Sequence, residues 1–437
     1  MRLQRIGIAE LEGLGGATGV AAHVRSLVPG ASSVEQAVRE IVQRVRAEGD
    51  AAVLDYTRRF DATAADRSQL GRRALVVAPE QLDEAIKRLP LDVVAGLQVT
   101  IANVAQVADA GVRDDAAVDL PQGQRIVLRE IPVASAAIYV PGGRAPYPST
   151  VAMGVVTARA AGVLDVAVCA PPGVDGEIDA VILGACRLCG VQRVYRMGGA
   201  QAIAALAYGT DTVARVDVVV GPGNLYVQEA KHQLSATVGI DGFAGPSDLL
   251  VVLGAEVGER EVHLAALDML AQAEHGEGTL VVAVSSGPGV NDALAAKLES
   301  LEAELPAAGG TFALVDAFDA RGAVELANAF APEHLQLIGA DAEALASRVQ
   351  SAGCVFVGAA SATAFGDYVA GSNHVLPTGG AARFASMLSP RHFRRRMAEV
   401  RIDAAGAGKL ANAGAPIARA EGFEWHARSM EARMGDN

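Results

Sequence analysis

The chain has 437 residues, which is enough for two or three domains. Apolar residues make up 51% of it and aromatic residues only 4%. The interior must therefore be filled mainly by Ala, Val, Leu and Ile, as in helices packed on parallel sheets. A net charge of −13 excludes a broad phosphate-binding surface, so we expect no nucleic-acid partner.

The N-terminal sequence MRLQRIGIAELEG contains acidic residues and no sustained apolar run, unlike a secretory signal. Nowhere do about 18 consecutive apolar residues occur, the length that a membrane-spanning helix needs. We therefore expect a cytoplasmic protein with no membrane partner.

The first half of the chain is expected to contain helices followed by a parallel sheet. Residues 34–107 have apolar residues at three- and four-residue spacing, which predicts helices. A short β segment follows at 123–133. Four strands, each followed by Gly or Pro and then a helical pattern, are predicted at 135–140, 165–170, 191–197 and 216–220.

The second half repeats this alternation and ends in a tail of different composition. Five more strands are predicted at 249–253, 278–286, 310–317, 334–339 and 354–359. The fold class is therefore α/β, with two Rossmann-like parallel-sheet domains, an N-terminal helical segment and a small helical C-terminal tail. The tail starts with a basic run at 391–397, which we interpret as a solvated helix face.

Three glycine-containing turns follow predicted strands: YVPGG (139–143), MGGAQ (197–201) and VGPGN (220–224). Such turns let the phosphates of a ligand approach backbone N–H groups at the start of a helix. None of them is a GxGxxG motif, so the turns alone leave nucleotide binding open.

Side chains that suit metal binding or catalysis occur in four places. Gln272 and His275 are three residues apart on a predicted helix, a spacing that suits two ligands of one metal. The other three places hold Glu333 and His334, Asp367 and His374, and Glu421 and His426. Residue spacing alone does not join these places into one site.

A resemblance joins them. The segments YVPGGRAPYPSTV, GGAQAIAALAYGT, VGPGNLYVQEAK, AGPSD, QAEHG, APEHL, GDYVAGSNHVLPT and AEGFEWH occur in this order. Together they resemble the histidinol dehydrogenase family from about residue 30 to the C-terminus. Two departures are visible: Asp248 stands where the family more often has Glu, and GVVTARAAG (154–162) replaces an Asn- and Pro-containing helix start.

The resemblance implies oxidation of L-histidinol through bound L-histidinal to L-histidine, with two NAD reduced, in the last steps of histidine biosynthesis. It implies one Zn²⁺ per subunit, with His334 as general base and Glu333 as the group that activates water. The implied zinc ligands are Gln272, His275, Asp367 and His426. The implied substrate contacts are these four residues with Ser247, His334, His374 and Glu421. The implied NAD contacts are Tyr139, Gln201 and Asn224.

The resemblance also suggests how the chain is divided and assembled. We expect an N-terminal arm (1–30), a first α/β domain with the zinc and catalytic residues (31–133 and 247–390), and an NAD-binding domain (134–246). The tail (391–437) is expected to cross a two-fold homodimer. Each active site would then take Glu421 and His426 from the other chain.

Two alternatives remain open. The same zinc and NAD chemistry could act on another small alcohol, such as a sulfonated diol. A metal-dependent hydrolase, in which Glu333 activates water and the glycine turns bind no nucleotide, is a different class. NAD binding discriminates between a dehydrogenase and a hydrolase. A catalytically silent binding protein is disfavoured by the full set of catalytic and zinc-ligand residues.

Overall fold

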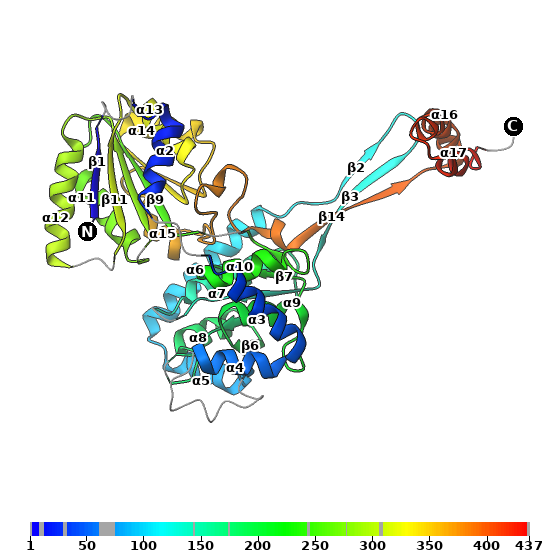
Figure 1. The fold of residues 1–437 in the computed structure, drawn as a ribbon, viewed down its shortest axis with the longest axis horizontal. Coiled ribbons are helices and arrows are strands. Elements are labelled where there is room, and N and C mark those ends of the chain that lie inside the picture. The colour runs from blue at the N-terminus through cyan, green and yellow to red at the C-terminus, as the bar shows by residue number, and fades with distance from the viewer. Residues whose placement is uncertain are drawn as a thin grey trace.

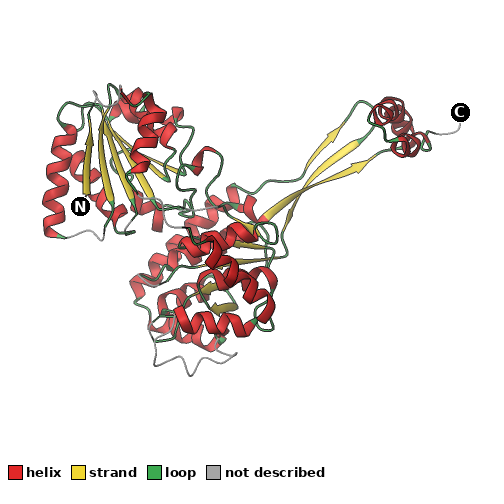
Figure 2. Cartoon of the chain, in the orientation of Figure 1, coloured by secondary structure: helices red, strands yellow, loops and turns green. Residues whose placement is uncertain are grey.

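A computed structural model describes residues 2–7, 13–28, 33–60, 75–142, 145–173, 175–242, 245–276, 278–305 and 309–434. The chain forms two α/β lobes, and a narrow three-stranded ribbon extends from them to a pair of helices (Figures 1 and 2). Two of the three sheets are parallel, and the third is the antiparallel ribbon. The α/β fold class predicted from the alternating apolar pattern is confirmed.

The first lobe is built on a six-stranded parallel sheet with the strand order β1-β11-β10-β9-β12-β13. Its strands are β1 (Arg2–Ile6), β9 (Asp248–Leu253), β10 (Leu280–Ser285), β11 (Thr311–Asp316), β12 (His334–Ile338) and β13 (Cys354–Val357). Every residue of β9, β10 and β12 is buried, because helices cover both faces of this sheet.

Alternate residues of β9 separate the two cores of this lobe. Leu250 and Val252 pack under α2 (Gly16–Ser26) and α13 (Ala320–Phe330), whereas Leu249 and Val251 pack under α11 and α12. The remaining helices of the lobe are α11 (Glu259–Ala273), α12 (Val290–Glu304), α14 (Ala340–Glu343), α15 (Thr363–Tyr368) and the 3₁₀ turns η2 (Ala346–Arg348) and η3 (Ala381–Arg383).

The second lobe is built on a five-stranded parallel sheet with the order β6-β5-β4-β7-β8. Its strands are β4 (Ser135–Tyr139), β5 (Asp165–Ala170), β6 (Arg193–Arg196), β7 (Val218–Val220) and β8 (Gly239–Ile240). Its inner helices are α7 (Pro148–Ala160), α8 (Ala180–Leu188), α9 (Gly199–Tyr208) and α10 (Leu225–Leu234). The structure contains a strand at each position between 135 and 359 where the sequence predicts one.

The helices predicted at 34–107 cover the second lobe, not the first. α3 (Glu35–Glu48) and α4 (Asp50–Phe60) pack on α9, while α5 (Pro79–Arg88) and α6 (Leu91–Ala110) pack on α8 and α7. Val38 and Val45, for example, share a core with Ile203 and Leu206. The expected grouping of 31–133 with 247–390 is therefore wrong for these helices, because an amphipathic pattern shows that a face is buried but not against what.

The expected N-terminal arm is also part of the first lobe. β1 pairs with β11, and Val20 and Val24 of α2 enter the core beneath α13. Among the described residues, α6 is the one helix long and apolar enough to cross a membrane by composition. In the folded chain one face of this helix is buried, at Leu97 and Val104, while Leu91 and Val99 on its other sides are exposed.

The ribbon consists of β2 (Ala116–Asp119), β3 (Arg125–Pro132) and β14 (Arg394–Arg401), all antiparallel. Its tip carries α16 (Ala404–Ala420) and α17 (Glu424–Glu431), the helices predicted for the tail (Figure 1). The basic run at 391–397 is not a helix face: it passes through η4 (Pro390–Phe393) into β14. Arg396 Nε donates to Glu130 on β3 over 2.7 Å, so a cross-strand acid pairs with one arginine of this run.

Candidate functional site

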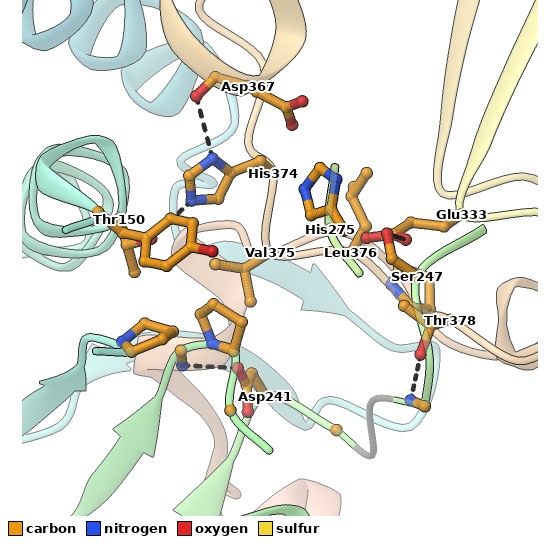
Figure 3. Close-up of a pocket in the computed structure, with 18 of the residues that line it drawn as sticks. Thr150, Asp241, Ser247, His275, Glu333, Asp367, His374, Val375, Leu376 and Thr378 are labelled. Atoms are coloured by element: carbon orange, nitrogen blue, oxygen red, sulfur yellow. Dashed lines mark hydrogen bonds between the residues drawn. The ribbon is translucent and has the colours of Figure 1, made fainter. Parts of the chain in front are cut away.

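A cavity of about 430 Å³ lies between the two lobes and is lined by predicted site residues, among them Ser247, His275 and Glu333 (Figure 3). The first lobe contributes the amino ends of its strands: Ser247 directly precedes β9, and His334 is the first residue of β12. The residues predicted for the site that line this cavity are Asn224, Ser247, His275, Glu333, His334, Asp367 and His374.

Glu333 is a buried carboxyl group held by hydrogen bonds from neighbouring strand ends. The Ser247 hydroxyl and the backbone N–H of Asp248 both donate to its Oε2, the latter over 3.0 Å. Burial raises the pKa of Glu333 to about 7. This carboxyl group therefore exchanges a proton near neutral pH, as a group that activates water must.

The His334 ring lies between two carboxyl groups. Its Nδ1 is 3.8 Å from Oε2 of Glu333, and its Nε2 is 3.7 Å from Oδ1 of Asp367. Burial lowers the pKa of His334, but the two carboxylates outweigh this effect and raise the pKa to about 9. Nδ1 is buried without a hydrogen-bond partner among the described residues, which suits a position for a ligand.

Gln272 and His275 are adjacent at the end of α11, although not on one helix face. The helix ends at Ala273, and a turn in which the N–H of His275 donates to the Gln272 carbonyl brings the imidazole beside the cavity. The Gln272 side-chain amide donates to Ser247 Oγ over 2.6 Å. His275 Nδ1 lies 3.0 Å from the Gln272 carbonyl oxygen, a contact of the kind that orients metal-ligating histidines.

His374 connects the two lobes. Its Nδ1 lies 3.0 Å from the backbone oxygen of Asp367, and its Nε2 lies 2.9 Å from Oγ1 of Thr150 on α7 (Figure 3). Burial lowers the pKa of His374, which favours the neutral ring. Thr150 lies in one of the segments that carry the resemblance, but no property of a single threonine marks it as a site residue.

The three predicted NAD contacts line a second cavity of about 690 Å³. Tyr139 ends β4 and its hydroxyl accepts from Gly199 N–H over 3.1 Å, while Asn224 caps α10 through its side-chain oxygen. Gln201 is a buried residue of α9. Since Asn224 and Gly142 line both cavities, the two cavities are adjacent. That Tyr139, Gln201 and Asn224 contact NAD remains a prediction.

Glu421 and His426 line neither cavity in a single chain and, unlike Gln272, form no hydrogen bond with a described residue that does. Both are exposed at the tip of the ribbon, where α16 ends and α17 begins (Figure 1). Within the described part of one chain, no three His, Cys, Asp or Glu side chains are placed to hold a metal ion. The donor types present, imidazole, carboxylate and amide oxygen, suit zinc, but one chain supplies them incompletely.

Comparison with known proteins points to a single family. The histidinol dehydrogenase family model matches residues 28–434. The histidinol dehydrogenase of Gluconobacter oxydans (strain 621H) is 38% identical over 415 residues, which cover 93% of this chain and 94% of the relative. The histidinol dehydrogenase of Parasynechococcus marenigrum (strain WH8102) is 40% identical over 411 residues, which cover 92% of this chain and 91% of the relative.

A solved structure agrees with this result. The crystal structure of histidinol dehydrogenase from Elizabethkingia anophelis has a TM-score of 0.88 to this chain at 28% sequence identity. The similarity covers 99% of this chain and 98% of the solved chain, so it includes both lobes, the ribbon and the tip.

Proposed function

Because this chain belongs to the histidinol dehydrogenase family, we propose that it is a cytoplasmic oxidoreductase of histidine biosynthesis. It oxidises L-histidinol through bound L-histidinal to L-histidine and reduces two NAD. The observation that carries this proposal is the buried Glu333–His334 pair in a cavity beside the one formed by the three glycine-containing turns. That arrangement suits two successive oxidations of one substrate beside one nucleotide site.

Gln272, His275 and Asp367 would hold zinc together with His426 of a second chain. Zinc, when bound, would orient the imidazole and amino groups of the substrate and lower the pKa of His334 by repelling its proton. His334 then takes the hydroxyl proton in the alcohol step. Its position against Asp367 supports this role, because the ring and the cation site are in contact.

Glu333 serves the second step. The aldehyde must gain a water molecule before it can lose another hydride, and a carboxyl group with a pKa near 7 accepts a proton from that water. Ser247 and His374 in the cavity, and Glu421 of the second chain, would hold the polar groups of the substrate. Tyr139, Gln201 and Asn224 would contact NAD, the hydride acceptor of both steps.

The first prediction concerns stoichiometry. Purified protein supplied with L-histidinol and excess NAD should form two NADH per histidinol consumed and release no aldehyde, because one cavity holds the groups for both steps. Absorbance of NADH and trapping of free aldehyde measure the two quantities. One NADH with released aldehyde would contradict the proposal, and no NAD binding by calorimetry would favour the hydrolase.

The second prediction concerns the metal. Chelation should abolish activity and zinc should restore it, and His275→Asn should bind zinc at least roughly tenfold more weakly because a donor is lost. Atomic absorption after dialysis measures the bound zinc. His263→Asn, on the same helix but outside the cavity, is the matched control and should keep its zinc. Full zinc occupancy in the His275 variant would overturn the ligand assignment.

The third prediction separates the two steps. Glu333→Gln should slow the oxidation of supplied histidinal by roughly 10²–10⁴-fold and the oxidation of histidinol to the aldehyde far less, since only the aldehyde step needs activated water. His334→Asn should slow the alcohol step strongly. Stopped-flow NADH formation with each substrate gives both rates. Equal losses in both steps for both variants would refute this division of roles.

The fourth prediction tests the shared site. Two inactive variants, His334→Asn and His426→Asn, are mixed under mild unfolding conditions and refolded together. If tails act on the other chain, random pairing should restore roughly a quarter of the wild-type sites, because each mixed dimer has one intact site. If tails act on their own chain, none is restored.

The control is a mixture of His334→Asn with His275→Asn. Both variants damage the same lobe, so their mixture should stay inactive in either arrangement. Native mass spectrometry confirms that mixed dimers form. Background activity in the His334 and His426 mixture, with mixed dimers present, would rule out the shared site.

A further inference from the structure

Arg25 lies in the last turn of α2, before residue 28, where the match to the family model starts. Its Nε donates to the carbonyl oxygen of Phe330 over 3.2 Å and its Nη2 to the same oxygen over 2.5 Å. Its Nη1 donates to Oδ2 of Asp248 over 3.2 Å. The guanidinium group also lies 3.9 Å from the centre of the Phe330 ring. The Arg25 side chain therefore contacts the segment at residues 330–331, which directly precedes Glu333 and His334.

Asp248 transmits this contact to Glu333. Its Oδ1 accepts the backbone N–H of Glu333 over 2.6 Å, while the N–H of Asp248 donates to the Glu333 carboxylate over 3.0 Å. Asp248 is 1% exposed, and burial raises its pKa while Arg25 opposes the rise. A buried carboxylate is costly unless a cation pairs with it. Arg25 is the cation with which Asp248 forms an ion pair.

The turn that leads from Phe330 to Glu333 is strained. Ala331 has a φ of 51°, the one positive value at a non-glycine residue in the described ranges. A residue in this left-handed region persists only where surrounding contacts fix it. Arg25 binds the carbonyl groups of Phe330 and Ala331, which flank the Cα of the strained residue, and Asp248 binds the N–H of Glu333 two residues further along.

We propose that Arg25 is a positioning residue for Glu333 and His334. It acts through Asp248 and through the carbonyl groups of the 330–331 turn, from an N-terminal helix that contributes no group to the cavity. Its removal leaves the Asp248 carboxylate without its cation and the turn without its donors, so Glu333 shifts relative to Ser247. The hydrogen bonds of Arg25 go to Phe330, Ala331 and Asp248, so its removal acts first on Glu333 and spares the NAD-contacting residues of the second lobe.

The test compares Arg25→Ala with His23→Ala, an exposed basic residue of the same helix. The first readout is amide hydrogen exchange of the 330–338 segment, which does not depend on activity. Exchange at the Glu333 amide should accelerate in Arg25→Ala and stay at the wild-type rate in His23→Ala, because Arg25, unlike His23, pairs with the acceptor Asp248. Arg25→Gln, which keeps much of the side-chain length, serves if the alanine variant does not fold.

The second readout is kinetic and rests on the proposed function. The kcat for histidinal should fall roughly tenfold to a hundredfold, as for a misplaced catalytic group, with the KM for NAD unchanged. Arg25→Lys should recover part of the loss, since it restores a charge to Asp248 without the forked donors. Arg25→Ala and Asp248→Asn should be non-additive, because both break the same connection.

Different failures have different meanings. Unchanged exchange at Glu333 in Arg25→Ala overturns the proposal whatever the activity. Equal kcat losses in Arg25→Ala and His23→Ala overturn it too, because they indicate a general effect of the helix. Wild-type protein that forms no NADH contradicts the proposed function instead, and the exchange measurement then decides on Arg25 alone.

Discussion

The burial of the Glu333 carboxyl group is the constraint on which the rest of the site depends. A buried carboxyl group must be hydrogen-bonded, and Ser247 and the N–H of Asp248 satisfy it. Ser247 in turn accepts the amide of Gln272, a proposed zinc ligand. The group proposed to activate water and a proposed ligand of the metal therefore share one hydroxyl group, so a shift of α11 would be transmitted to Glu333.

The two sheets present opposite ends to the cleft. The first sheet contributes the amino ends of β9 and β12, where an N–H not used by the sheet can donate to a carboxylate, as that of Asp248 does. The second sheet contributes the carboxyl ends of β4 and β7, where glycine turns lead into helices and favour phosphate groups. In the proposed function this division would separate acid–base chemistry from nucleotide binding.

Much of this could be predicted from the sequence. Buried parallel strands appear as continuous apolar runs, so the inner strands of both sheets were predictable, whereas the edge strands β1 and β8 were not predicted. The resemblance joined Ser247, Glu333, His334 and Asp367 into one cavity. The lobe against which the helices at 35–110 pack was not predictable. The apolar periodicity of a helix shows that one face is buried, but not which element covers that face. The strand β14 was missed because a run of arginines gives no strand pattern, and the acid that pairs with Arg396, Glu130, is 266 residues away in sequence. Asp248 appeared only as a departure from the family, and Arg25 gave no signal at all.

The tip of the ribbon explains why assembly and catalysis are linked in the proposed function. Its core consists of three buried alanines, Ala415, Ala418 and Ala427, with Met430 packed against them. So small a core contributes little stability by itself. The same two helices leave Phe423 and Trp425 more than half exposed, at 53% and 79%. Covering these aromatic rings with a second chain would stabilise the tip. Since His426 lies in the same helix as Trp425, the contact that stabilises the tip would also fix the position of the proposed fourth zinc ligand.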